Sequence, residues 1–197
     1  MNSDLDQNAF RTAETLAEHL AYAWNYLATL KALQRHANES PNILDTSPHF
    51  FSTIMLALWA DLFLKLAHCS DKRKEATGFP KLFKQLRAYL PQPHHLRNRV
   101  DKAERQLNLL QVRTKVENWR NLVIAHYTIT REFEEFYKKN VCSLDEVESL
   151  IRALNALLHS FSVDLWSQVF VVEDMAHHAC QGVDRLVQGM TVYPQHT

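Results

Sequence analysis

Residues 119–126 read WRNLVIAH, a stretch in which polar and apolar side chains are sharply separated. Leu122 to Ala125 are apolar, so we expect them to pack against a core and to hold their neighbours at its edge. Arg120 carries a planar, permanently charged guanidinium, Asn121 offers amide donors and an acceptor, and His126 titrates near neutral pH. The pattern R-N-x4-H therefore predicts a polar site beside a packed segment.

The composition of the chain favours helices. Its 197 residues include only three glycines, far below the average of roughly 7%, which leaves few positions for tight hairpin turns. A chain of this length can bury one good core and is short for two ordinary domains. We therefore expect a single domain over residues 1–197, with its core between about residues 8 and 170.

Apolar residues recur at helical spacing along most of the chain. The expected helices span about residues 8–37, 48–69 after Ser47, 79–90 before the Pro91–Pro93 break, 94–125, 144–169 after a capping box at Ser143, and 174–189 as a C-terminal accessory helix. Residues 127–141 fit either an irregular loop or a short helix. The pattern predicts an all-α, antiparallel bundle of four principal helices with one or two accessory helices.

Two of these helices have unusual features. At 1.5 Å per residue, a helix over 94–125 would be roughly 45 Å long, which is more than a domain of this size needs, so we expect a kink or a break within it. The helix over 48–69 is apolar nearly all round and is expected to lie centrally in the bundle. Asp61 in its middle would then need a partner or water.

Other features limit the class of protein. The cysteines are widely spaced, with no C-x-x-C pair, and are Cys69, Cys142 and Cys180. They predict neither a disulfide framework nor a zinc ribbon. Residues 1–7 are polar and acidic, unlike a signal peptide, and the apolar run 54–66 is interrupted by Asp61 and Lys65 and is too short to span a bilayer. We expect a cytoplasmic protein without a membrane partner.

The geometry of a helix limits what one copy of the motif can do. Six residues advance by about 240° and rise by about 9 Å, so Arg120 and His126 do not share a face. Asn121 and His126 differ by about 140°. One copy is thus a poor self-contained site unless the helix ends just before His126. Two copies related by a two-fold axis, the commonest oligomeric arrangement, can place paired arginines and histidines in one cleft.

The motif and the helix over 48–69 resemble HEPN domains, and in particular their abortive-infection U branch. The resemblance rests on Trp119-Arg120-Asn121, on Ile124-Ala125-His126 late in a helical chain, on Phe50-Phe51 and on ALWADLFLKL at 57–66. It covers roughly residues 10 to 130. The chain departs from the family pattern at Thr128, where an acid is expected, so a helper carboxylate has no candidate at that position.

The resemblance implies a metal-independent endoribonuclease that acts as a homodimer, with motif residues of both protomers lining a shared groove. RNA carries its own nucleophile, the 2′-OH, so we expect no metal or other cofactor. His126 would act as general base or acid, Arg120 would stabilise charge on the phosphorane, and Asn121 would orient the histidine or a phosphate oxygen. The expected products are a 2′,3′-cyclic phosphate and a 5′-hydroxyl.

Further residues are candidates for supporting roles. Asp61 would either orient a motif residue or be a satisfied polar group of the core, and Tyr127 follows the motif directly. The segment from Lys65 to Arg120 holds fourteen Lys or Arg against five Asp or Glu in a chain of zero net charge, which indicates a one-sided electrostatic surface. Candidates to track an RNA backbone are Arg97, Arg99, Lys102, Arg105, Arg113 and Lys115. A plain solvated helix surface is the alternative for this group.

Two other interpretations of the motif stay open. The chain could be a catalytically silent helical module that binds RNA, a nucleotide or a protein partner through the same groove. It could also be a toxin or phage-defence effector whose groove is covered by an antitoxin protein, as the resemblance implies. The solvent accessibility of Arg120 and His126 distinguishes the silent module from a nuclease, because a nuclease cannot have both side chains sealed inside one protomer.

Overall fold

The computed structural model describes residues 3–39, 47–73, 76–90, 95–125 and 138–192, and within them all regular structure is helical. This confirms the all-α prediction, and the arrangement fits a HEPN-type bundle. The helices are α1 (Ser3–Glu39), α3 (Pro48–Ser70), α4 (Phe79–Tyr89), α5 (His95–Leu109), α6 (Gln111–Ala125), α8 (Leu144–Trp166) and α9 (Asp174–Val192). The single-domain organisation stays a prediction.

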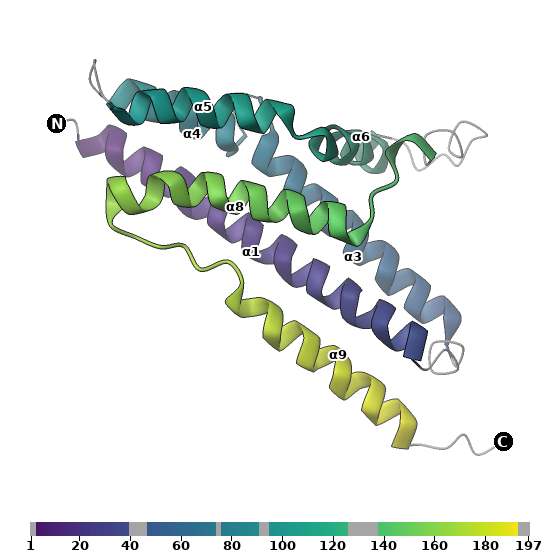
Figure 1. The fold of residues 1–197 in the computed structure, drawn as a ribbon. Coiled ribbons are helices and arrows are strands. Elements are labelled where there is room, and N and C mark those ends of the chain that lie inside the picture. Colours follow the sequence, from purple (N-terminus) through teal and green to yellow (C-terminus); the bar gives the residue numbers. More distant parts are fainter. Residues whose placement is uncertain (1–2, 40–46, 74–75, 91–94, 126–137, 193–197) are drawn as a thin grey trace.

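Helix α1 forms the axis of the bundle (Figure 1). It packs against α3, α4, α8 and α9, which surround it along its length. Its most deeply buried positions recur every three or four residues and are Ala9, Ala13, Leu16, Leu20, Ala23, Leu27 and Leu30. This spacing places all of them along one broad stripe of the helix, so α1 supplies the apolar surface on which the other helices assemble.

Helix α3 is not the central helix that its sequence predicted. It packs on α1 and on α6, and it leaves the face of Leu56 open, where this side chain is 71% exposed. Phe50, about 120° away around the same helix, is 50% exposed. Asp61 is also exposed, so its carboxylate needs no partner in a core. The prediction was wrong because an apolar helix surface indicates that something covers it, without indicating that the same chain does.

The length of α3 corrects a second expectation. By length and composition alone, this 23-residue helix could cross a membrane, although core helices of soluble proteins pass the same test. Only 28% of its most apolar window is buried, so the described part of the chain leaves most of this window uncovered. A single helix of this length and composition is weak evidence for a membrane segment.

The segment over 94–125 is broken, as expected. Leu110 separates α5 from α6, and its N–H donates to the Leu107 carbonyl at 3.4 Å. Arg113 closes the end of α5, because its Nη1 donates to the Leu107 carbonyl at 3.2 Å and to Asn108 Oδ1 at 3.0 Å. The break lets α5 pack on α4 and α8 while α6 packs on α3.

The C-terminal part of the chain completes the bundle. The predicted capping box at the start of α8 is confirmed, since Glu146 N–H donates to Ser143 Oγ at 3.1 Å and Ser143 N–H donates to Glu146 Oε2 at 2.8 Å. The helix ends earlier than predicted, at Trp166, where Ser167 adopts a left-handed conformation with φ of 53°.

Helix α9 lies along the C-terminal half of α1 (Figure 1), over a second apolar cluster made of Ala32, Leu33, Phe51, Val183 and Val187.

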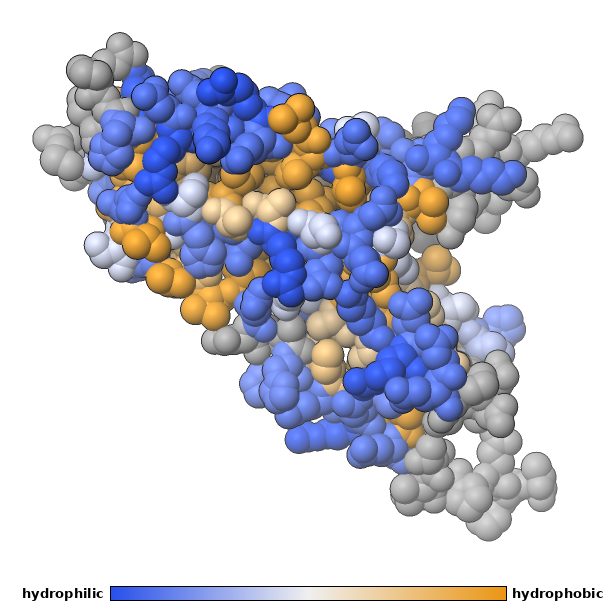
Figure 2. Space-filling view, viewed as in Figure 1, coloured by the Kyte–Doolittle hydropathy of each residue, from blue (hydrophilic) through white to orange (hydrophobic). Residues whose placement is uncertain are grey.

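The outer surface is mostly hydrophilic in the view of Figure 2, with apolar side chains gathered along the seam between α5 and α8. Leu109, at the end of α5, is 78% exposed there. A groove of about 510 Å³ follows this seam and is lined by residues of both helices, including Lys102 and Ala156.

Candidate functional site

The last turns of α6 place the motif against the C-terminal end of α3. Trp119 stacks on Phe63 of α3, with ring centroids 5.7 Å apart and an interplanar angle of 13°. Its Nε1 donates to the Asn140 carbonyl at 2.7 Å. Trp119 thus packs against the core, and it fixes the rotation of α6 so that Arg120 faces the segment after α3.

Arg120 is held by two side-chain acceptors. Its Nη1 donates to Asp71 Oδ2 at 3.1 Å, and its Nε and Nη2 donate to Asn121 Oδ1 at 3.2 and 3.0 Å. The Arg120 side chain is 19% exposed, whereas that of Asp71 is 4% exposed. The guanidinium is therefore fixed by hydrogen bonds while part of the Arg120 side chain stays exposed, so the residue is not sealed inside the protomer.

Asp71 is the residue that sequence reasoning missed. Besides Arg120, it accepts from the Arg73 backbone N–H at 3.0 Å and from Arg73 Nε and Nη2 at 2.9 and 2.6 Å. These hydrogen bonds from Arg73, with the nearby positive charge of Arg120, lower the pKa of Asp71 against the opposing effect of burial. The local D-x-R sequence is a turn signal, but nothing in it indicates a partner 49 residues away.

A second bridge joins the same two elements. Ser70 is buried and its Oγ donates to Glu117 Oε1 at 3.0 Å, and Arg113 Nε donates to the same oxygen at 2.9 Å. Together with the Asp71 and Arg120 pair, this contact fastens α6 to the end of α3. The site is thus built on two rigid elements, which is the support that a precise binding site requires.

His126 and Tyr127 lie outside the described residues. Their placement relative to Arg120, and with it the composite site, stays a prediction. The motif is therefore described at Arg120 and Asn121, which lie side by side and share a hydrogen bond.

Asp61 does not hold the described part of the motif. It is exposed on α3, where its carboxylate is near enough to Tyr26 of α1 to add to the effect of burial in raising the pKa of that phenol. The side-chain partners that the structure gives Arg120 are Asp71 and Asn121 instead. The sequence predicted a possible supporting carboxylate within α3, at Asp61. The carboxylate that contacts Arg120 is that of Asp71, one residue beyond the end of α3.

The six basic residues predicted to follow an RNA backbone differ in their environments. Lys102 and Arg105 are exposed on α5, and Arg105 donates to the Asp101 carbonyl of the same helix. The other four bind further acceptors of the protein: Arg97 donates to the Arg87 carbonyl, Arg99 to Asp164 and the Ser160 carbonyl, Arg113 to Glu117, and Lys115 to Glu146 and the Val141 carbonyl. The contacts of Arg97, Arg99 and Lys115 join α5 and α6 to α4 and α8, which is a structural role. The RNA-binding role of the six residues stays a prediction.

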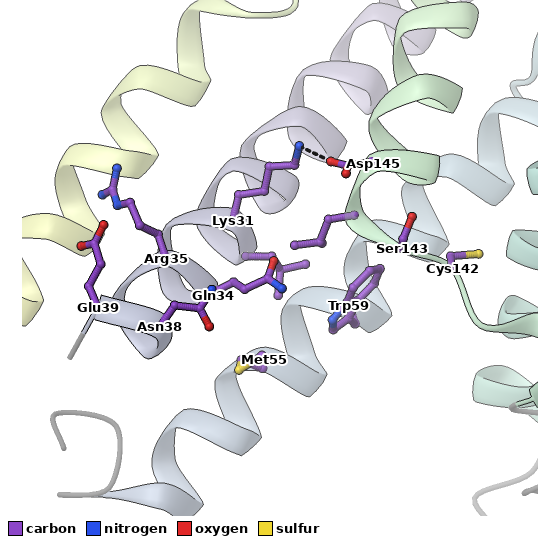
Figure 3. A pocket seen from close by; sticks show the side chains of 12 residues that line it. Lys31, Gln34, Arg35, Asn38, Glu39, Met55, Trp59, Cys142, Ser143 and Asp145 are labelled. Atoms are coloured by element: carbon purple, nitrogen blue, oxygen red, sulfur yellow. Dashed lines mark hydrogen bonds and ion pairs between the residues drawn. The ribbon is translucent and has the colours of Figure 1, made fainter. Parts of the chain in front are cut away.

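Two connected clefts lie beside the motif helix. One, of about 710 Å³, lies between α1, α3 and the start of α8, and in Figure 3 Lys31 points across it to Asp145, 2.9 Å away. An apolar slot of about 260 Å³ shares Trp59 and Cys142 with this cleft and reaches Trp119. Burial raises the pKa of Cys142 to about 11, which disfavours the thiolate, the nucleophilic form of a cysteine.

A comparison with protein families shows which family the chain belongs to. A family model of AbiU2, a HEPN domain, matches residues 11–185. The chain belongs to the AbiU2 family of HEPN domains. A search of the curated proteins and a search of the solved structures each found no match. The match runs well beyond residues 10–130, where the sequence resemblance lies, so α8 and most of α9 are also part of the AbiU2 domain.

Proposed function

We propose that this AbiU2 protein is a metal-independent endoribonuclease that acts in abortive infection and cleaves RNA at a site shared by two copies of the chain. The observation that carries the proposal is that the buried Asp71 fixes Arg120 while 19% of the Arg120 side chain stays exposed. A cation held in place before the substrate arrives stabilises developing negative charge without reorganising. Arg120 also lies six residues before His126, the proton-transfer candidate.

The proposed reaction needs only groups from RNA and the motif. The 2′-oxygen attacks the adjacent phosphorus as His126 takes its proton, and the bond from phosphorus to the 5′-oxygen breaks. The partner's His126 protonates the leaving oxygen, and Arg120 neutralises charge on the phosphorane. The products are a 2′,3′-cyclic phosphate and a 5′-hydroxyl.

The first experiment compares the wild type with His126→Ala and Arg120→Gln on labelled RNA in the presence of EDTA. We expect cleavage by the wild type with cyclic phosphate ends, and a loss of at least about 100-fold in both variants. His178→Ala removes an exposed histidine of α9 and should cleave like the wild type. Cleavage that needs added metal, or that persists in His126→Ala, would contradict the proposal.

A silent binding module is the second candidate. It is favoured by the hydrogen bonds of Arg120 to Asp71 and Asn121, because a purely structural arginine would make the same contacts. If neither the wild type nor the variants cleave RNA while the wild type still shifts RNA in a gel, the binding module becomes the better account.

A toxin function makes a separate prediction. If cleavage harms the host, expression of the wild type alone should give a poor yield, and His126→Ala should restore it. Co-expression with an antitoxin protein would rescue the wild type in the same way. Equal yields of the two proteins would argue against a toxin.

A further inference from the structure

A second group of polar side chains lies beside Asp71, outside the R-N-x4-H motif. It lines a cleft of about 360 Å³ between α1, the end of α3 and the loop that follows, and consists of Thr15, His19, His68, Arg73, Ala76 and Thr77. The rings of His19 and His68 are 5.5 Å apart and tilted by 34°. Asp71 joins this cleft to the motif, because it accepts hydrogen bonds from both Arg73 and Arg120.

His19 has an unsatisfied hydrogen-bonding atom. Its Nδ1 is buried and has no hydrogen-bond partner among the residues that the structure describes. Buried polar atoms in native proteins are nearly always paired, so an unpaired one calls for a water or a ligand. The second ring, that of His68, is exposed to solvent at the same cleft.

The charges around the cleft favour an anion. Lys65 is near enough to His19 that, after burial, its charge is the next cause that lowers the pKa of His19, followed by His68. Arg73 adds a guanidinium at the rim. Among the described residues, Glu18 is the acid whose charge acts on His19, and Asp71, on the far side of Arg73, is already engaged by two arginines. The donors that line the cleft are two imidazoles and a guanidinium, and a guanidinium binds a phosphate but not a divalent cation.

We propose that this cleft binds a phosphate group through the imidazoles of His19 and His68, with the positive charges of Arg73 and Lys65 beside them. The phosphate comes from RNA or from a free phosphate compound. With RNA as its source, the inference rests on the proposed function and adds a binding subsite next to the one at Arg120.

The test measures binding of inorganic sulfate to the full-length protein by calorimetry and by NMR of the histidine rings. Sulfate is used because its charge does not change between about pH 5.5 and 7.5, where imidazoles titrate. We expect the His19 and His68 signals to shift on binding. His19→Gln and His68→Gln should each bind sulfate about tenfold more weakly, and His178→Gln should bind as the wild type does.

The affinity for sulfate should also depend on pH. A bound anion favours the charged form of an imidazole, so binding should tighten as the pH falls through the range in which imidazoles gain protons. The other charged groups near the two rings in the described part of the chain are Glu18, Lys65 and Arg73, with Asp71 bound to Arg73. Wild-type affinity for sulfate in both glutamine variants, or an equal loss in His178→Gln, would overturn the proposal. The exposed position of His68 keeps this test valid even if His19→Gln fails to fold.

A short oligoribonucleotide separates the two sources of phosphate. If RNA is the source, sulfate and the oligonucleotide compete, and His68→Gln raises the KM for cleavage by about tenfold. If only the free anion binds, the oligonucleotide does not compete and the site belongs to a free phosphate compound. Sulfate binding that depends on His19 and His68 without any RNA cleavage would remove the proposed function and keep the phosphate site. RNA cleavage without sulfate binding at His19 and His68 would keep the proposed function and remove the phosphate site.

Discussion

At the residue scale, Asp71 determines how Arg120 is held. A buried carboxylate that receives hydrogen bonds from two arginines keeps both guanidinium groups in place, and it does so at the end of a helix rather than within one. Catalysis by charge stabilisation depends on such fixed orientation. Asp71 is therefore a positioning residue for the proposed reaction.

Replacing Asp71 with Asn should destabilise the fold and lower RNA cleavage. The amide keeps the size of the side chain but removes the charge that pairs with Arg120 and Arg73. Because both arginines are partly exposed, we expect a loss of about 1–3 kcal/mol in the free energy of unfolding, measured in urea. The control is Asp101→Asn, because the Asp101 side chain is 53% exposed and that of Asp71 only 4%, and its expected loss is below about 1 kcal/mol. Equal losses in both variants would show that Asp71 is an ordinary surface partner.

The same carboxylate predicts part of the acid sensitivity of the protein. The pKa of Asp71 in the folded state lies below its ordinary value of 3.8, so the folded state favours the charged form. Its stabilising contribution is complete above about pH 4 and is lost as the pH falls through the lowered pKa. The stability difference between the wild type and Asp71→Asn should therefore narrow in acid. Urea unfolding at a series of pH values measures this, and a constant difference down to about pH 2 would contradict it.

At the element scale, the start of α8 offers a clean comparison of helix caps. Ser143 at its N-cap exchanges two hydrogen bonds with Glu146, whereas Ser47 at the N-cap of α3 makes no side-chain cap hydrogen bond. We expect Ser143→Ala to cost about 1 kcal/mol of stability and Ser47→Ala to cost only a few tenths. Thermal unfolding of both variants tests this, and a larger effect at Ser47 would be the contrary result.

At the scale of the whole molecule, the open face of α3 calls for a partner. This face carries Leu56, which is 71% exposed and also lines the apolar slot that reaches Trp119 of the motif helix. We expect a second copy of the chain to cover it, since a two-fold pairing here would bring two motif helices together. The homodimer is a proposal that a molar mass in solution can test.

Leu56→Glu should convert the dimer to a monomer, because it places a charge in the middle of the proposed interface. Leu109→Glu is the matched control: Leu109 is even more exposed, at 78%, but it lies on α5 rather than on α3. Sedimentation equilibrium or light scattering gives the mass. A monomeric wild type, or a dimer broken by Leu109→Glu and not by Leu56→Glu, would place the interface elsewhere or remove it.

Much of the fold was predictable from local patterns. The helical spacing of apolar residues predicted α1, α4 and α8, and the capping box marked the start of α8. The excessive length of the 94–125 segment predicted a kink or a break, which the structure places at Leu110. The motif residues and the helix over 48–69 also led to the HEPN family, which the AbiU2 match bears out. Such signals are local patterns along the chain, most of them between residues within about four positions of one another, so the sequence alone contains them.

Only the tertiary structure decided which helix lies at the centre and which acid holds the motif. Both α1 and α3 carry enough apolar surface to be central, and the choice of α1 depends on how all the helices pack together. The contact between Asp71 and Arg120 joins residues 49 positions apart, and no local pattern encodes it. The sequence by itself determined the helices and the family, because these follow from short-range periodicity and motif. The core, the open face of α3 and the support of Arg120 are long-range properties that exist only once the chain has folded.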